Sequence, residues 1–300
     1  AGLNWANLPS QGNSIYFINP ETGWNISPGF PVRKTTNSGN EWFNVGGSFA
    51  RGYKIRFFNI NTGFIVSAYG QIYRTDDGGY FWTHSTDLIS YGLYQDIFFT
   101  NFNTGYCLAD GGRILKTINS GKSWFISNVI PNNLASVFFV NDFTGWLGTS
   151  FGSPDIYKTT NGGVIWDPQI DIQNGRVDAI HFININTGFA AGGQYKLLST
   201  SNSGVDWSTR DIGCAYIYDF YSFDTLNILL AGLGSGWNAI YKSTNSGVSW
   251  FLCNFPGDIV YSVDFINGNT GFAGSNFGRL YKSTDGGNNW IHGIGNYSSI

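Results

Sequence analysis

One eight-residue pattern, [ST]-x-[DN]-x-G-x-x-W, recurs seven times along the 300 residues and limits the possible folds more than any other feature. Its copies end at Trp42, Trp82, Trp124, Trp166, Trp207, Trp250 and Trp290. Successive Trp residues are 40, 42, 42, 41, 43 and 40 positions apart, which leaves no room for a second kind of domain. A period of about 40 to 45 residues is typical of four-stranded propeller blades. The whole chain is therefore predicted to be one repeat array.

The remainder of each unit predicts four strands. A β-branched and aromatic run ends in a turn such as FNINTGF (58–64), an apolar run and a variable loop follow, and a run such as IYKST leads into the eight-residue box. No window has the apolar period of a helix. The predicted fold is all-β: one seven-bladed β-propeller of four-stranded antiparallel blades spanning 1–300. The expected blades are about 14–45, 46–86, 87–128, 129–170, 171–210, 211–254 and 255–295, with 1–13 as an extra N-terminal strand.

The third position of the box is predicted to be structural rather than catalytic. An Asp or Asn there can accept hydrogen bonds from its own turn, and the Gly two positions later tolerates a positive φ. Five of the seven residues are Asn, which cannot perform carboxylate chemistry. The structural set is Asn37, Asp77, Asn119, Asn161, Asn202, Asn245 and Asp285.

At these boxes the chain resembles the Asp-box (BNR) repeats of sialidases, xyloglucan-cleaving glycoside hydrolases and sortilin-type receptors. The fuller unit, F-x-N…TG[WF]…[KR][ST]T[ND]xGxxW, is most similar to the photosystem II stability/assembly-factor family of seven-bladed propellers. The resemblance covers essentially the whole chain and implies the fold, whereas its members differ in activity. It also implies an arginine-rich surface patch, but the eight Arg of this chain are spread along its length.

A glycoside hydrolase is the enzymatic alternative. A sialidase-like site requires a Tyr nucleophile with a Glu partner, yet the only Glu residues, Glu21 and Glu41, lie in a turn and in a box. A xyloglucanase-like site requires two facing carboxylates, for which a pair such as Asp96 and Asp264 is a candidate. The sequence favours a non-catalytic role and identifies no catalytic residue.

Other chemistry has no clear sequence signal. The three His are widely spaced, so no metal site is expected, and no cofactor motif is present. Cys107 falls in an apolar strand and is expected to be a buried small hydrophobe, whereas a Cys214–Cys253 disulfide is left open. A net charge of -3 with dispersed Lys and Arg argues against nucleic-acid binding. The recurring [KR] before the box is interpreted as a solvated strand position.

An extracellular, cell-surface or periplasmic location is expected. The chain contains no Met and starts at Ala1, which is typical of a mature segment. No apolar run reaches 18 residues, so no transmembrane segment is predicted. Few charges and two Asn-x-Ser sequons, at Asn25 and Asn296, are compatible with this location.

Binding is expected on the face opposite the boxes, because the loops there are variable. Six blades supply an aromatic residue at corresponding loop positions, and these are the predicted ligand-binding residues: Phe30, Tyr69, Phe151, Tyr195, Trp237 and Phe277. Four polar residues interrupt an aromatic series on the innermost strand and are predicted to line the central channel: Arg56, His181, Asp219 and Asp264. The alternative is that the aromatics pack between loops and the polar residues hold water.

Ring closure is the last expectation. Trp5 and Trp290 both resemble the Trp of an outer strand, and only one of them can complete the seventh blade. The strand containing Trp5 is predicted to dock on that blade. The favoured function is a non-catalytic binding or assembly module that recognises carbohydrate or a partner protein through the variable face. The alternatives are a glycoside hydrolase and a structural subunit that assembles with its own copies.

Overall fold

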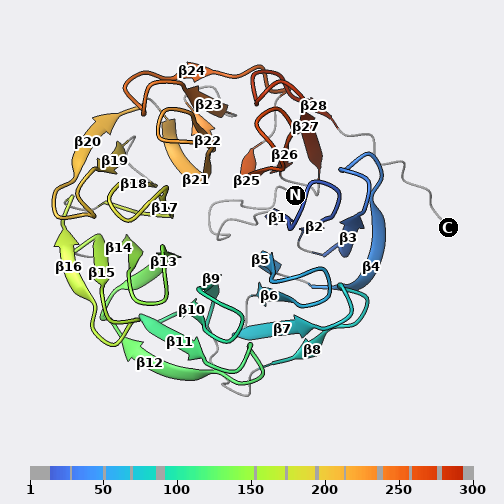
Figure 1. Ribbon diagram of the computed structural model, residues 1–300, viewed down its shortest axis with the longest axis horizontal. Coiled ribbons are helices and arrows are strands. Elements are labelled where there is room, and N and C mark those ends of the chain that lie inside the picture. The colour runs from blue at the N-terminus through green and yellow to red at the C-terminus, as the bar shows by residue number, and fades with distance from the viewer. Residues whose placement is uncertain are drawn as a thin grey trace, which may run out of the picture.

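Seven four-stranded antiparallel sheets surround a central opening in the computed structural model, which confirms the predicted fold class (Figure 1). The structure describes residues 14–27, 29–49, 52–67, 70–85, 92–151, 154–172, 175–192, 196–212, 214–234, 239–256, 259–275 and 279–292. In every sheet the strands pair in chain order, so each blade is a simple meander. No helix in the described part of the chain is both long and apolar enough to cross a membrane.

The strands are short and regularly spaced. In the first four blades, from the innermost strand outward, they are β1 Ser14–Phe17, β2 Gly23–Ile26, β3 Pro31–Thr35 and β4 Phe43–Ser48; β5 Gly52–Phe57, β6 Gly63–Ser67, β7 Gln71–Thr75 and β8 Thr83–His84; β9 Tyr94–Phe99, β10 Gly105–Ala109, β11 Arg113–Thr117 and β12 Phe125–Val129; β13 Asn133–Phe139, β14 Gly145–Phe151, β15 Ile156–Thr159 and β16 Asp167–Ile170. In the last three blades they are β17 Ala179–Phe182, β18 Gly188–Ala191, β19 Lys196–Thr200 and β20 Ser208–Asp211; β21 Cys214–Ser222, β22 Ile228–Gly234, β23 Ala239–Ser243 and β24 Phe251–Leu252; β25 Val260–Phe265, β26 Gly271–Ser275, β27 Leu280–Ser283 and β28 Ile291–His292.

The box residues form the same hydrogen-bonded turn in all seven blades. In the fourth blade the Thr159 hydroxyl donates to Oδ1 of Asn161 at 3.0 Å and accepts the N–H of Gly163 at 2.9 Å. The same Asn161 oxygen accepts the N–H of Ile165 at 2.9 Å. The Asp boxes use the same contacts, since Oδ1 of Asp285 accepts the N–H of Asn289 at 2.9 Å. These bonds fix the turn between the third and fourth strands.

The box turn and the turn between the first two strands lie on one face of the ring. The fourth box residue of each blade donates its N–H to a carbonyl in the first turn of the same blade, as Gly162 does to Phe143 at 2.9 Å. Corresponding bonds occur in all seven blades. This observation confirms the expectation that both turns share a face, which leaves the other loops on the opposite face.

Aromatic residues link each blade to the next. The repeated Phe that ends an innermost strand stacks on an aromatic of the preceding blade, as Phe139 does on Tyr106 with ring centroids 4.4 Å apart. The same Phe139 meets Trp166, the box Trp of its own blade, edge-on at 5.8 Å. Because each Phe touches two blades, the core continues from one blade to the next.

The ring closes between the last blade and the first. Strands β1 and β25 are in contact, and Phe17 stacks on Phe272 with centroids 4.4 Å apart. The fourth strand of the last blade is β28, which directly follows Trp290. The strand that contains Trp5 therefore does not fill this position. Trp5 and the rest of 1–13 lie outside the described residues.

The structure decides two possibilities that the sequence left open. Asn25 is buried, donates to the Ser14 carbonyl and accepts a bond from Arg33, so its sequon is inaccessible to glycosylation in the folded protein. The other sequon, at Asn296, lies outside the described residues. Cys253 is a buried free thiol, so the disulfide with Cys214 is not formed. Cys107 is fully buried, as expected.

Candidate functional site

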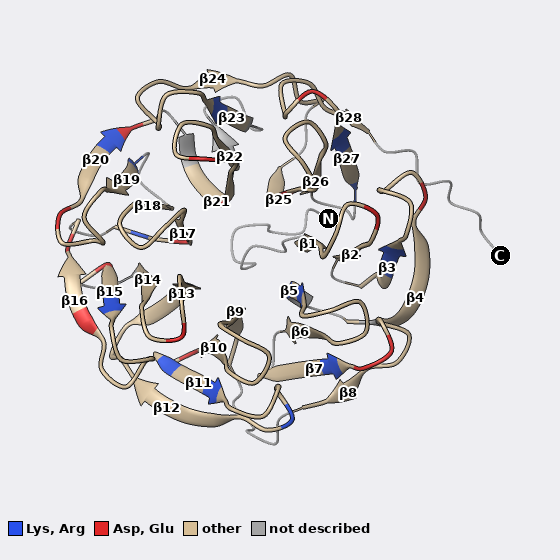
Figure 2. Cartoon of the chain, in the orientation of Figure 1, with Lys and Arg blue, Asp and Glu red and all other residues tan. Residues whose placement is uncertain are grey.

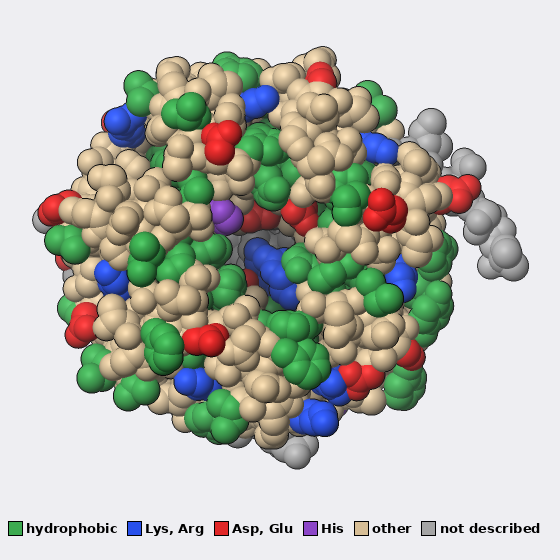
Figure 3. Space-filling view, in the orientation of Figure 1, with side chains coloured by type: hydrophobic (Ala, Val, Ile, Leu, Met, Phe, Trp, Pro, Cys, Tyr) green, Lys and Arg blue, Asp and Glu red, His purple; other side chains and the backbone are tan. Residues whose placement is uncertain are grey.

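A cavity of about 300 Å³ lies on the ring axis, where the innermost strands β1, β5, β9, β13, β17, β21 and β25 face one another. Charged side chains surround this hollow in the space-filling view (Figure 3). All four predicted channel residues, Arg56, His181, Asp219 and Asp264, line it. Asp96, which the sequence offered only as a possible catalytic partner of Asp264, lines it as well, as do Lys54 and Asp178, which sequence reasoning did not include.

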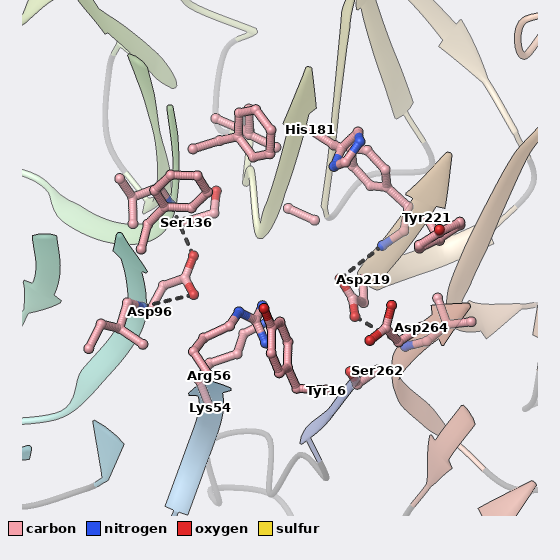
Figure 4. Close-up of a pocket in the computed structure, with 18 of the residues that line it drawn as sticks. Tyr16, Lys54, Arg56, Asp96, Ser136, His181, Asp219, Tyr221, Ser262 and Asp264 are labelled. Atoms are coloured by element: carbon pink, nitrogen blue, oxygen red, sulfur yellow. Dashed lines mark hydrogen bonds between the residues drawn. The ribbon is translucent and has the colours of Figure 1, made fainter. Parts of the chain in front are cut away.

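Three of the channel carboxylates connect neighbouring blades (Figure 4). Oδ2 of Asp96 accepts the N–H of Val137 from the next blade at 3.0 Å. Oδ2 of Asp219 accepts the N–H of Val263 at 3.1 Å. Each innermost strand has one edge that pairs with no other strand. A buried N–H on that edge would be left without an acceptor at a cost in free energy, and the carboxylate of the adjacent blade accepts it instead.

Asp264 forms a further bond between blades at the closure of the ring. Its Oδ2 accepts the N–H of Phe17 in the first blade at 2.8 Å, and its Oδ1 accepts the N–H of Phe265 at 2.9 Å. Ser262 contributes a second bond to the same seam, since its Oγ accepts the N–H of Ile15 at 3.4 Å. These carboxylates are therefore parts of the scaffold.

The basic side chains of the cavity come from one strand, β5. The Arg56 guanidinium donates to the carbonyl of Ile55 at 3.0 Å and lies 5.6 Å from the ring centroid of Tyr16, within cation–π range. Lys54 lines the same cavity two residues earlier. Figure 4 shows both side chains reaching toward the centre of the channel, between Asp96 and Tyr16.

Burial shifts the protonation of two channel residues. Desolvation raises the pKa of Asp264 to about 7, although the Phe17 N–H and the Arg56 charge oppose the shift. Desolvation also lowers the pKa of His181 to about 4, and the Asp219 charge only partly offsets this. At neutral pH His181 is therefore uncharged, and Asp264 is near its midpoint of titration.

This arrangement does not resemble a hydrolytic site. A glycosidase needs one carboxyl to protonate the leaving group and another to act as nucleophile or base. Asp96 and Asp264 instead use both oxygens to accept backbone N–H groups. In the part of the chain that the structure describes, no three His, Cys, Asp or Glu side chains gather into a possible metal site.

Only part of the predicted aromatic series can be placed. Phe30 is 45% exposed. Phe151 ends β14, but its side chain is not among those described. The other four predicted residues, Tyr69, Tyr195, Trp237 and Phe277, lie outside the described residues. Their role in binding therefore remains a prediction.

Exposed apolar side chains recur on the face that carries the boxes. Five consecutive blades place a large apolar residue at the tip of the turn between their first two strands, and each is between 46 and 66% exposed. These turn tips are Ile60, Phe102, Phe143, Ile185 and Leu226. Sequence reasoning dismissed this face as repetitive, although the apolar residues within the otherwise polar turns were visible.

The structure also corrects the interpretation of the lysine at the [KR] position before the box, which was expected to be solvated. In four blades it does not simply point into solvent, because it connects its blade to the box of the next. Nζ of Lys158 donates to the Ser203 carbonyl at 2.8 Å and lies 5.5 Å from the Trp146 ring centroid. Lys116, Lys242 and Lys282 donate to the corresponding carbonyls of the blades that follow them. Figure 2 shows these cations on the third strands of the blades.

Comparisons with known proteins agree with this architecture. The family described as "Photosynthesis system II assembly factor YCF48" matches residues 36–180. A solved structure of YCF48 bound to a D1 peptide is 19% identical, with a TM-score of 0.74, and the match covers 92% of this chain and 95% of that one. YCF48 from Cyanidioschyzon merolae is also 19% identical, with a TM-score of 0.68 and coverage of 93% and 95%.

Enzymes share the fold as well. The GH74 xyloglucanase from Xanthomonas campestris is 12% identical, with a TM-score of 0.62, and the match covers 96% of this chain and 61% of that one. No curated protein matches the sequence. At these identities the solved structures establish the fold alone. Together with the family match, they show that the chain is a BNR-repeat β-propeller similar to the YCF48 photosystem II assembly factors.

Proposed function

We propose that this protein is a non-catalytic module that binds a protein partner. The observation that carries the proposal is the set of five turn tips, in which consecutive blades each expose a large apolar side chain at one of two adjacent turn positions. Recurring exposed apolar groups on one face are typical of an interaction surface. A rigid ring keeps them in fixed positions, so little ordering is needed when a partner binds.

Two further observations support a binding role. The channel carboxylates that a hydrolase would use are engaged in holding neighbouring blades together. One of the similar structures, YCF48, was solved with a peptide of a partner protein, D1. A propeller of this kind is therefore suited to recognising a protein segment. Carbohydrate is the second candidate ligand, since exposed aromatic rings can also stack on sugar faces.

The variable loop face is the second candidate surface for the same function. Its proposed ligand-binding residues are Phe30, Tyr69, Phe151, Tyr195, Trp237 and Phe277. Phe30 is exposed, which such a role requires. We also propose that the protein acts outside the cytoplasm, on the cell surface or in the periplasm, which fractionation of the source cells with an antibody would test.

Site-specific photo-crosslinking tests the function and identifies the surface. A photoreactive residue is placed at Phe143 on the turn-tip face, or at Phe30 on the variable face, and the protein is crosslinked in its source cells. Adducts with one protein from position 143 would support the turn-tip surface, whereas adducts from position 30 would support the variable face. Absence of a protein adduct at both positions, together with binding on a glycan array, would contradict the proposal.

Matched variants then measure how much the surface contributes. Phe102→Ser and Phe143→Ser combined should weaken binding of the crosslinked partner at least about tenfold, because central apolar anchors commonly contribute more than 1 kcal/mol each. Val129→Ser is the control, since Val129 is 57% exposed but lies on an outer strand. Equal losses in the control and in the double variant would mean that the turn tips are not the binding surface.

A further inference from the structure

One carboxyl group that lines the channel bridges the seam between the last blade and the first. Asp264 is half-buried in the channel wall, and its two oxygens accept the N–H groups of Phe17 and Phe265. The bond to Phe17 joins residues 247 positions apart in the chain. Every ring of blades has one seam where the chain ends meet, so a weak point there affects the whole fold.

Few charges compensate an ionised Asp264. The groups that face it are Tyr16 from β1, Arg56 from β5, and Asp219 and Tyr221 from β21. Arg56 is the cation of this set, but it donates to a backbone carbonyl and no ion pair with Asp264 is formed. Strands β22 and β26, which also pack against β25, contain no titratable residue.

Asp219 makes ionisation of Asp264 less favourable. It lies on the innermost strand of the neighbouring blade, and its negative charge raises the pKa of Asp264. Figure 4 shows the two carboxylates close together. His181, Lys54, Asp96 and Asp178 line the same cavity from other blades.

We propose that the seam between the last and first blades is a pH-sensitive latch, which is closed most firmly when Asp264 is protonated and opens more often once it ionises. Opening brings the carboxylate into water, where an ionised group is better solvated. The equilibrium between the closed and the open seam therefore shifts toward the open form as pH rises. This device is independent of which partner the ring binds.

The direction and size of the effect follow from linkage. In the open seam Asp264 regains a pKa near its usual value, whereas in the closed seam its pKa is about 7. The population of the open form should increase as pH rises toward 7 and then level off. Between pH 6 and pH 8 the expected increase is about tenfold.

Amide hydrogen exchange of the full chain measures this opening directly. Exchange of the Phe17 amide, corrected for the intrinsic effect of pH, should rise about tenfold between pH 6 and pH 8. The Val137 amide is the internal control, because Asp96 holds it in the same way between the third and fourth blades. A Phe17 response that is flat, or equal to that of Val137, would overturn the proposal.

Two variants separate the latch from general instability. In Asp264→Asn the pH response of the Phe17 amide should disappear, whereas Asp96→Asn should retain it. If Asp264→Asn does not fold, Arg56→Gln provides the test, because loss of the nearby cation should move the levelling-off to a higher pH. Persistence of the response in Asp264→Asn, or an unchanged levelling-off in Arg56→Gln, would show that another group controls the seam.

Discussion

The carboxylate of Asp264 accepts the backbone N–H of Phe17 at 2.8 Å, and this bond joins the last blade to the first. Asp96 and Asp219 also accept a backbone N–H from the next blade, at two other blade junctions. Three of the channel carboxylates are thus explained first by the unpaired edges of the innermost strands. Any other role they have must be compatible with this one.

The box residues should contribute to stability through their turn bonds. Replacing Asp285 by Ala removes an oxygen that accepts two hydrogen bonds, one from the Asn289 N–H and one from the Ser283 hydroxyl. We expect a loss of roughly 1 to 3 kcal/mol in the free energy of unfolding, measured with urea. Asp285→Asn should retain most of the stability, since five boxes already have Asn at this position. A stable Asp285→Ala protein that had lost partner binding would contradict a structural role.

The connecting lysines should matter more than their position on the surface suggests. Lys282 donates to the Ser38 carbonyl at 3.0 Å and to Oδ1 of Asn40 at 2.9 Å, across the closing seam. Lys282→Met keeps the aliphatic contacts and removes the donor, so it should cost about 1 to 2 kcal/mol of unfolding free energy. Lys122→Met, in the exposed part of a box turn, is the control and should change stability by less than about 0.5 kcal/mol. Equal effects in thermal or urea unfolding would argue against this role.

One glycine of the first turn is required by close packing. A Cβ on Gly63 would lie 2.6 Å from the ring of Phe57, which is itself held between blades. Gly63→Ala should therefore destabilise the fold by roughly 1 to 3 kcal/mol. Gly268→Ala is the control, because no atom lies within 4 Å of the Cβ that it adds to the corresponding turn of the last blade. It should leave the free energy of unfolding nearly unchanged. Similar melting temperatures for the two variants would contradict this packing argument.

His181 should oppose Asp264 in the pH dependence of global stability. The folded pKa of His181 is about 4, below its unfolded value, so its contribution falls as pH drops below about 6.5 and is fully lost near pH 4. This change amounts to about 3 kcal/mol at most. The raised pKa of Asp264 acts in the opposite direction, since stability falls as pH rises from about 4 toward 7.

The variant His181→Phe isolates the carboxylate. Phe98 and Phe138 occupy the equivalent position in the third and fourth blades, so Phe should be accommodated. Without the imidazole, urea unfolding should show higher stability at pH 4.5 than at pH 6.5. A variant whose stability still rises with pH over this range would mean that Asp264 does not have the raised pKa assigned to it.

The fold could be read from the sequence because its signals are local and repeated. A box fixes its own turn, and the Phe and Trp of each unit recur at a constant spacing, so seven copies of one pattern specify seven blades. The assignment of Arg56, His181, Asp219 and Asp264 to the channel came from the same alignment of repeats. The strand register confirms that Arg56, His181 and Asp264 stand where other blades have an aromatic. It corrects the alignment of Asp219, which takes the position of Asp96 and Ser262, because Tyr221 occupies the aromatic position of its blade.

Contacts between blades were harder to predict. The bond from Lys158 to Ser203 and the bond from Asp96 to Val137 join residues 45 and 41 positions apart. Sequence spacing shows that such residues recur, but not which neighbour they reach. The exposure of Phe143 was missed for another reason, because a turn tip can fold back or project and the letters of the turn do not distinguish these outcomes.

The central claim is that the channel carboxylates hold the ring together and that the protein binds rather than cleaves its ligand. Release of reducing ends from a polysaccharide panel that includes xyloglucan tests this claim most directly. We predict no release above background by the purified wild-type chain. Release by wild type that disappears in folded Asp96→Asn and Asp264→Asn variants would contradict the account and identify the protein as a glycoside hydrolase.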